Sequence, residues 1–159
     1  MPTSAGVGTG SFTALTLVQT NCRVSTFPVF FGRYDPIVAN KTDNLNASGT
    51  ISVACVRGTA PTIALGPGLS AAGATRRMRQ LFGDDFLSYE LYQPPSNVPG
   101  IACAYPGVVV WGNAGANLFS AASAPSKNAR TYQVCGTVPA GQNPRIGVYA
   151  DIVVATVNF

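Results

Sequence analysis

The residues of this chain that could do chemistry are four cysteines and six acidic side chains, and the sequence contains no histidine. Without histidine, neither a Ser-His-Asp nor a Cys-His nucleophile can be assembled. Only Asp84 and Asp85 are adjacent acids, and they lie in a turn signal in which aspartate is favoured for backbone reasons. A glycosidase pair of carboxylates from distant loops is the remaining enzymatic alternative, and it ranks low. We therefore expect a protein that is not an enzyme and has no cofactor.

The cysteines favour two disulfides. Cys22, Cys55, Cys103 and Cys135 show no C-x-x-C spacing, and the lack of histidine argues against a zinc site. An even count in a strand-rich, charge-poor chain favours disulfides and an oxidising compartment over four free thiols in the cytosol. Three pairings are possible, and we favour Cys22–Cys55 and Cys103–Cys135. Each would close a loop of roughly thirty residues, contributing about 3–4 kcal/mol in the chain-entropy model.

Composition predicts one all-β domain. The chain has 159 residues, of which 47% are hydrophobic and 10% charged, with 17 glycines and 12 prolines. No stretch repeats apolar residues with helical spacing or reaches membrane-spanning length. No signal-peptide pattern is present, so we expect any signal peptide to have been removed or left out. The net charge is +4, but the one basic cluster, residues 76–79, precedes two aspartates, so we expect local ion pairs and no nucleic-acid partner.

Short apolar or alternating segments, separated by turn signals, predict a β-sandwich. Gly136 interrupts one of them, which indicates a bulge or a close backbone approach. Trp111 follows three valines and is expected in the core. Loops are expected at residues 43–49, 93–107 and 113–128. Strands are expected at residues 11–19, 50–56, 61–65, 78–82, 86–92, 108–111, 130–138 and 147–159.

The segment 147–159 is the most informative strand, because it is apolar on both faces. Ile152 and Val154 share one face, and such a strand belongs inside a sheet or sandwich. Since the sequence ends at Phe159, we expect no later segment to pair with it, which leaves a place for a strand from elsewhere. The residues on its other face are Tyr149, Val153, Ala155, Val157 and Phe159.

Several short matches, in order, identify a family. They are Cys22, Phe31-Gly-Arg-Tyr-Asp35, Gly49-Thr-Ile-Ser-Val-Ala-Cys55, Arg77-Met-Arg79, Tyr89-Glu-Leu-Tyr92, Trp111-Gly112, Tyr132 with Gly136, Pro139-Ala-Gly-Gln142, Gly147, Tyr149, Asp151 and Val157-Asn-Phe159. With them, the chain from about Phe12 onward resembles the spore coat protein U domain family, which includes subunits of archaic (Csu-type) chaperone–usher pili. The segment 93–110 departs from the family pattern, because it looks longer and carries Cys103.

The resemblance implies an incomplete immunoglobulin-like sandwich, completed by a donor strand from another subunit. Residues 1–20 would be an N-terminal extension with the donor strand, and residues 21–159 the pilin-like domain, in which Cys22–Cys55 fits the usual disulfide. The edge of the acceptor groove would comprise Val153, Ala155, Val157 and Phe159. The inserted face of the donor would comprise Phe12, Ala14, Thr16 and Val18 or, in the alternative phase, Leu15 and Leu17.

The function that the resemblance implies is structural. We expect a subunit of a surface fibre that is secreted through the periplasm and polymerised by donor-strand exchange. Its partners would be identical or related subunits, with a periplasmic chaperone and an outer-membrane usher during assembly. Two alternatives stay open: a tip adhesin that contacts a surface or glycan through the loop 93–107, and a spore-coat or sheath component that assembles laterally.

Overall fold

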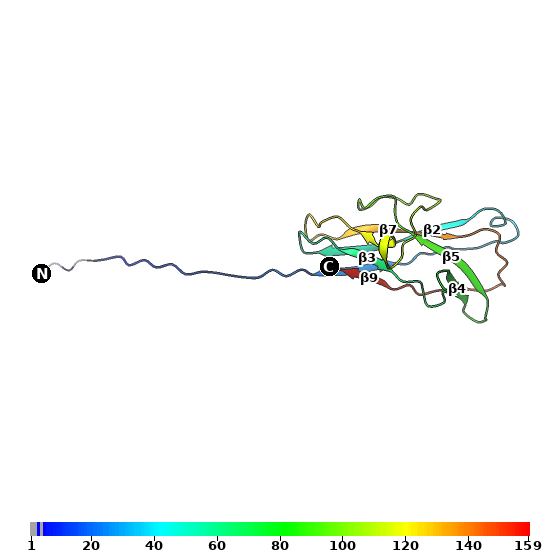
Figure 1. The fold of residues 1–159 in the computed structure, drawn as a ribbon, viewed down its shortest axis with the longest axis horizontal. Helices are drawn as coiled ribbons and strands as arrows, with labels where there is room; N and C mark the ends of the chain where they lie inside the picture. The colour runs from blue at the N-terminus through cyan, green and yellow to red at the C-terminus, as the bar shows by residue number, and fades with distance from the viewer. Residues whose placement is uncertain (1–2, 4) are drawn as a thin grey trace.

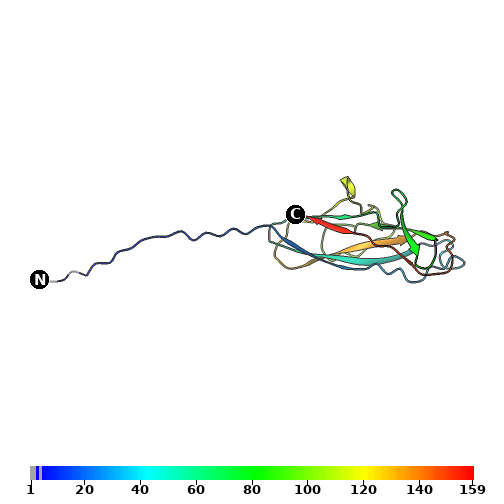
Figure 2. The same cartoon turned by 90° about the horizontal axis from the view of Figure 1, so that it is seen from below.

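An extended N-terminal tail leads into a body made of two β-sheets (Figure 1). The computed structural model describes residue 3 and residues 5–159, so residues 1, 2 and 4 of the predicted extension lie outside the described residues. The described tail residues, as far as Asn21, are exposed and belong to no strand. The tail points away from the body (Figure 2). Residues 11–19, predicted as a strand, therefore pair with no other described segment of their own chain.

Antiparallel pairing joins the strands of both sheets. The larger sheet has the order β1-β2-β7-β5-β4-β8 and the smaller one the order β6-β3-β9. The described residues contain no helix long and apolar enough to cross a membrane. The elements are β1 Cys22–Phe27, β2 Leu45–Cys55, β3 Thr62–Leu65, β4 Arg76–Gln80, β5 Phe86–Tyr92, the 3-10 turn η1 Gly115–Asn117, β6 Phe119–Ser120, β7 Arg130–Val138, β8 Tyr149–Ala150 and β9 Ala155–Asn158.

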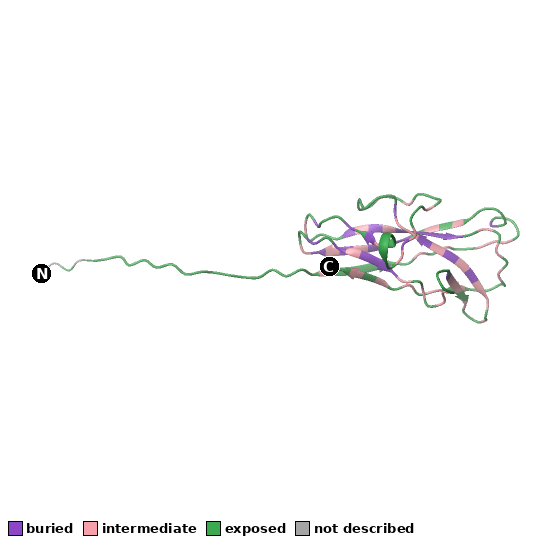
Figure 3. Cartoon of the chain, viewed as in Figure 1, coloured by how far each residue is buried: buried purple, intermediate pink, exposed green. Residues whose placement is uncertain are grey.

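The core forms where the alternating faces of the two sheets meet (Figure 3). In β2, Ile51 and Val53 are buried, while Ser52 between them remains partly exposed, as a period of two requires. Trp111 is fully buried, and its indole N–H donates a 2.9 Å hydrogen bond to the carbonyl of Ile63. Its ring lies 4.9 Å from the ring of Phe119, measured between centroids. The prediction that Trp111 belongs to the core is confirmed.

The loop predicted at residues 43–49 is wrong, because β2 begins at Leu45. Its polar composition reflects a strand end near the surface, where Leu45 and Ala47 are half-buried and Asn46 and Ser48 are exposed. Pairing with β7, with Leu45 opposite Val138, determines the extended conformation. Packing against a neighbouring strand outweighs the local composition here.

The single closing strand predicted at residues 147–159 is also wrong, because the segment is divided between the two sheets. β8 pairs with β4 in the larger sheet, whereas β9 pairs with β3 in the smaller one. Residues 151–154 cross from one sheet to the other. Only one face of the segment packs against the core, through Tyr149, Val153, Ala155 and Val157, whereas Ile152 and Val154 on the other face are more than half exposed. The expected burial of both faces is therefore wrong.

Two disulfides connect the elements. Cys22 is bonded to Cys55, the residue directly opposite it in the β1–β2 pair. Cys103 is bonded to Cys135 and so ties the long segment between β5 and β6 to the central strand β7. These are the two pairings favoured from the sequence.

Candidate strand-accepting groove

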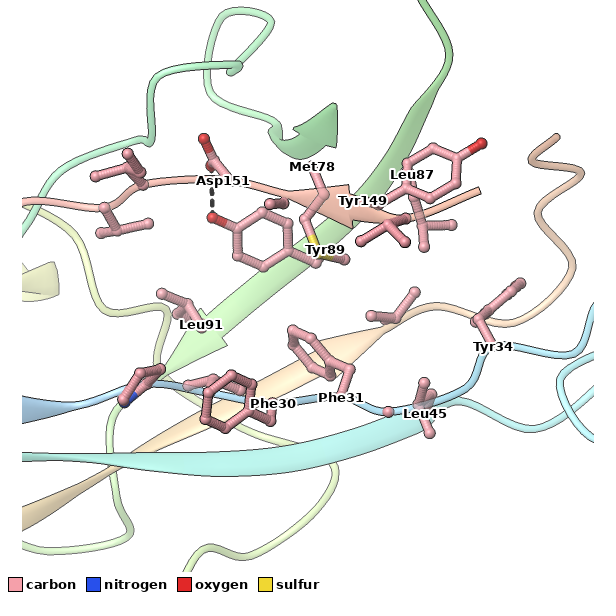
Figure 4. Close-up of a pocket in the computed structure, with 18 of the residues that line it drawn as sticks. Phe30, Phe31, Tyr34, Leu45, Met78, Leu87, Tyr89, Leu91, Tyr149 and Asp151 are labelled. Carbon is pink, nitrogen blue, oxygen red and sulfur yellow. Dashed lines mark hydrogen bonds between the residues drawn. The ribbon is translucent and has the colours of Figure 1, made fainter. Parts of the chain in front are cut away.

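A long apolar groove of about 1360 Å³ opens between two segments of the body. Residues 26–36 form one wall, and residues 144–153 with Ala155 form the other. Figure 4 shows Phe30, Phe31 and Tyr34 on the first wall, facing Tyr149 and Asp151 on the second. The sheet side chains between them are Ile51, Leu65, Met78, Leu87, Tyr89, Leu91, Val134 and Val138.

The first wall is chain that has separated from its neighbouring strand. β1 ends at Phe27, and Pro28 has no N–H with which to continue the pairing with β2. Within the described structure, residues 28–34 make no backbone–backbone hydrogen bond. Their N–H and C=O groups are therefore available to another strand.

Phe31 anchors this wall to the core. Its ring lies 6.1 Å from the ring of Tyr89, measured between centroids. A Cβ on Gly136 would lie only 2.7 Å from Cζ of Phe31. Because Gly136 has no side chain, the ring of Phe31 can approach its backbone closely. This is the close approach that a glycine within a predicted strand indicated.

The second wall is hydrogen-bonded along one edge. The carbonyls of Ile152 and Val154 accept backbone hydrogen bonds of 3.1 and 2.9 Å from Leu69 and Gly66. Because successive residues of a strand direct their polar groups to opposite sides, the N–H and C=O groups of Val153 and Ala155 face away from those bonds. β9 is also the last strand of its sheet. Both walls therefore offer strand edges to a segment lying in the groove.

One polar pair interrupts the apolar lining. The hydroxyl of Tyr89 donates a 2.6 Å hydrogen bond to Oδ2 of Asp151, and the N–H of Ser70 donates a 3.2 Å bond to Oδ1. Burial of the hydroxyl, followed by the hydrogen bond to the Asp151 carboxylate, raises the pKa of Tyr89 far above its ordinary value. Tyr89 therefore stays protonated, and this pair needs no ligand to satisfy its hydrogen bonds.

A buried guanidinium holds the sheet strands together beside the groove. Nη2 of Arg76 donates to the carbonyls of Gly66 and Trp111 at 2.8 and 2.7 Å. Its Nη1 forms an ion pair with Glu90 on the neighbouring strand β5. Because Arg76 is only 3% exposed, this one side chain ties β4 and β5 to the chain segments that follow β3 and precede η1.

Comparison with known sequences agrees with this architecture. The sequence profile of the Spore Coat Protein U domain matches residues 8–156. The chain belongs to the spore coat protein U domain family. It is also 40% identical, over 139 residues, to Protein U of Myxococcus xanthus, a match that covers 81% of this chain and 70% of that protein.

A solved structure gives the same picture for this spore coat protein U domain. The fold is similar to a chain in the crystal structure of the CsuC–CsuE chaperone–tip adhesion subunit pre-assembly complex from archaic chaperone–usher Csu pili of Acinetobacter baumannii. The TM-score is 0.58 and the identity 25%, over 89% of this domain and 40% of that chain. The domain thus spans less than half of that chain. The predicted all-β, immunoglobulin-like fold class is confirmed.

The structure places the predicted site residues of this domain in two separate regions. Val153 and Ala155 line the groove, whereas Val157 packs against the core from β9 and Phe159 lies beyond that strand, half exposed. The tail residues do not enter the groove of their own chain. These exposed tail residues are Phe12, Ala14, Leu15, Thr16, Leu17 and Val18.

Sequence reasoning missed the opposite wall of the groove. Phe30, Phe31 and Tyr34 lie directly after β1, outside every strand and loop expected from the sequence. The signal for an unpaired wall was Pro28, which stops the β1–β2 pairing while the apolar residues continue. It also missed the Arg76–Glu90 pair, because nothing local indicates that this arginine is buried.

Asp85 gives this domain a testable dependence on pH. The backbone N–H of Arg145 donates to its Oδ2 at 2.6 Å and the hydroxyl of Tyr149 at 3.0 Å. These bonds, Arg145 first, lower the pKa of Asp85 below its ordinary value of 3.8. A carboxyl group whose pKa is lower in the folded than in the unfolded protein stabilises the fold at pH values above its ordinary pKa. That stabilisation is lost as the pH falls through the folded-state pKa. Between pH 5 and pH 2.5, the melting temperature of wild type should therefore fall more than that of Asp85→Asn; parallel melting curves would contradict this.

Proposed function

We propose that this protein is a structural subunit of a surface fibre, in which the groove of each copy is filled by the N-terminal tail of the next. The observation behind the proposal is the pairing, in one chain, of an apolar groove with two free strand edges and an apolar tail without a partner. Phe12 and Leu15 of the tail are more than nine-tenths exposed. A secreted protein that left both surfaces open would be prone to aggregate.

The tail and the groove have complementary chemistry. Strand addition supplies affinity through main-chain hydrogen bonds and specificity through alternate side chains that enter pockets. The tail, residues 3–21, has no charged residue, so its insertion buries no unpaired charge. We propose residues 1–20 as the extension with the donor strand and residues 21–159 as the accepting domain.

Assembly would require helpers that cover the groove. The similar solved structure is a chaperone–subunit pre-assembly complex. By that likeness, we propose that a periplasmic chaperone holds this subunit before polymerisation and that an outer-membrane usher delivers it to the cell surface. Two disulfides fit this oxidising, extracellular route.

A peptide experiment tests the proposal directly. Adding a synthetic peptide of residues 5–20 to the protein lacking residues 1–20, at about 100 times its Kd, should raise the melting temperature by roughly 5–10 °C. A peptide of the same composition in scrambled order is the matched control. Peptides with Phe12→Ser and Val18→Ser, or with Leu15→Ser and Leu17→Ser, would show which face inserts, because only one pair should remove the shift. Equal shifts from the native and scrambled peptides would refute the proposal.

One observation favours a tip adhesin as the second candidate. The segment between β5 and β6, tied to β7 by Cys103–Cys135, exposes Val108 and encloses a second, smaller cavity of about 240 Å³. The lining of that cavity includes Pro94, Pro95 and Pro106. An adhesin that caps a fibre needs no donor strand, so a dispensable tail would favour it.

Electron microscopy would distinguish fibres from the laterally assembled sheets of a coat.

A further inference from the structure

The end of the body that lies farthest from the tail exposes several large apolar side chains. Three loops meet there, joining β1 to β2, β4 to β5 and β7 to β8 (Figure 1). Each presents large apolar side chains to solvent: Ile37 and Val38 are about three-quarters exposed, Phe82 is 97% exposed and Ile146 is 98% exposed. We call these four residues the apolar end. Such a cluster marks an interaction surface more often than an inert one.

Hydrogen bonds hold the three loops in a fixed arrangement. The N–H of Gly141 donates to the carbonyl of Asn40 at 3.0 Å, which joins the first loop to the third. The amide of Gln80 donates to the carbonyl of Ile146 at 2.9 Å, and the N–H of Leu81 donates to the carbonyl of Val148 at 2.9 Å, which join the second loop to the third. The apolar end is therefore a built surface and not a set of independent loop tips.

The groove leads directly to this surface. Ile146 lines the groove and also belongs to the apolar end. The protein's own tail leaves the body at the opposite end, beside the C-terminus (Figure 2). A chain of subunits can grow head to tail only if the inserted tail enters each groove near that C-terminus and emerges at the apolar end. The reverse direction would bring the next body to the end already occupied by the subunit's own tail.

The charges of the two ends support contact between copies. Loops at the tail end are tied to the start of β1, since the N–H of Val56 donates to the carbonyl of Asn21 and the N–H of Gly58 to that of Ala124, both at 2.9 Å. The loop residues 56–61 and 121–129 carry Arg57 and Lys127 and no acidic residue. The loops of the apolar end carry both signs. Asp43 and Asp84 are exposed to solvent there, Asp84 within an exposed ion pair with Arg79.

We infer that the apolar end of each subunit docks on the tail end of the next copy in the fibre, an inference that rests on the proposed function. The inserted tail brings the two ends together. The apolar side chains then lose solvent, and Asp43 and Asp84 face Arg57 and Lys127 of the following copy. The contact makes the joint between subunits stiff, where an inserted tail alone would leave it free to swivel.

Fibre stiffness tests this contact separately from strand exchange. A variant with Ile37→Ser, Val38→Ser and Phe82→Ser, which leaves the groove-lining Ile146 in place, should give the wild-type ladder of SDS-resistant oligomers, while its persistence length in electron micrographs falls at least twofold. Val98→Ser with Val108→Ser, which removes exposed apolar side chains elsewhere, should change neither readout. Asp43→Lys with Asp84→Lys should also soften the fibre, and adding Arg57→Glu with Lys127→Glu should restore the stiffness.

The outcomes separate the two ideas. A normal ladder with unchanged stiffness in both the serine and the lysine variants would overturn the docking contact and leave the proposed function standing. A variant that melts like wild type but loses the ladder would also overturn it, because its side chains would then act in strand exchange. Absence of the ladder in wild type would refute the proposed function, and the contact with it.

Discussion

A protein lacking residues 1–20 is expected to form no fibres, while its body folds and remains bound to its chaperone. The deletion removes the exposed apolar side chains of the tail and leaves the groove, with its two free edges, unchanged. In the proposed assembly the tail of one copy completes the next, so the deletion leaves no donor. The measurement is the ladder of SDS-resistant oligomers, together with electron microscopy. The expected effect is complete loss of polymer.

A substitution series gives the same test without shortening the chain. Replacing Phe12, Leu15, Leu17 and Val18 by aspartate places charge on both possible inserted faces of the tail. The ladder should then be lost whichever face enters the groove. Asp at the exposed Val108, outside both groove and tail, is the matched control and should leave the ladder intact. Normal polymerisation by the truncated or charged tail would rule out donor-strand exchange.

Replacing Arg76 by methionine is expected to lower the free energy of unfolding by about 3–5 kcal/mol. The substitution leaves Glu90 without its partner and removes the donors to the carbonyls of Gly66 and Trp111. A largely buried charge without its partner and two buried acceptors without donors cost more than the lost ion pair itself. Urea unfolding of the purified protein measures the change.

A surface ion pair on the same strand supplies the control. Arg79 pairs with Asp84 at 2.9 Å, but both side chains are largely exposed. Arg79→Met should therefore cost less than about 1 kcal/mol. Replacing both Arg76 and Glu90 by methionine should recover part of the loss, because no charge is then left buried alone. A loss below about 1 kcal/mol for Arg76→Met would show that the pair does not hold the strands together.

Local pattern was sufficient for those strands whose two faces differ. The strand expected at residues 86–92 matches β5, and the one expected at 78–82 overlaps β4, which begins two residues earlier. The strand expected at 50–56 falls within β2 apart from its last residue, and Ile51, Val53 and Cys55 alternate on its buried face. The alternation of apolar and polar residues along a strand shows directly which face is buried. This prediction therefore does not depend on which strand is the partner. The pattern failed for the polar start of β2, where pairing with β7 determines the conformation.

One wall of the groove was expected from the family resemblance and not from local pattern. That resemblance implied a groove edge that includes Val153 and Ala155, and both residues line the groove. The opposite wall, with Phe30 and Phe31, could not be expected. Its role depends on where the chain separates from β2 and on which distant segment it then faces.

By itself, the sequence determined an all-β chain, its favoured disulfide pairings, its family and an apolar tail without a charge. These follow from residue types, short spacings and order along the chain. Only the tertiary structure decided that the closing segment crosses between two sheets, that Arg76 is buried against Glu90, and that two unpaired walls enclose one groove. The physical reason is that pairing and burial depend on contacts between segments far apart in sequence, which local composition does not specify.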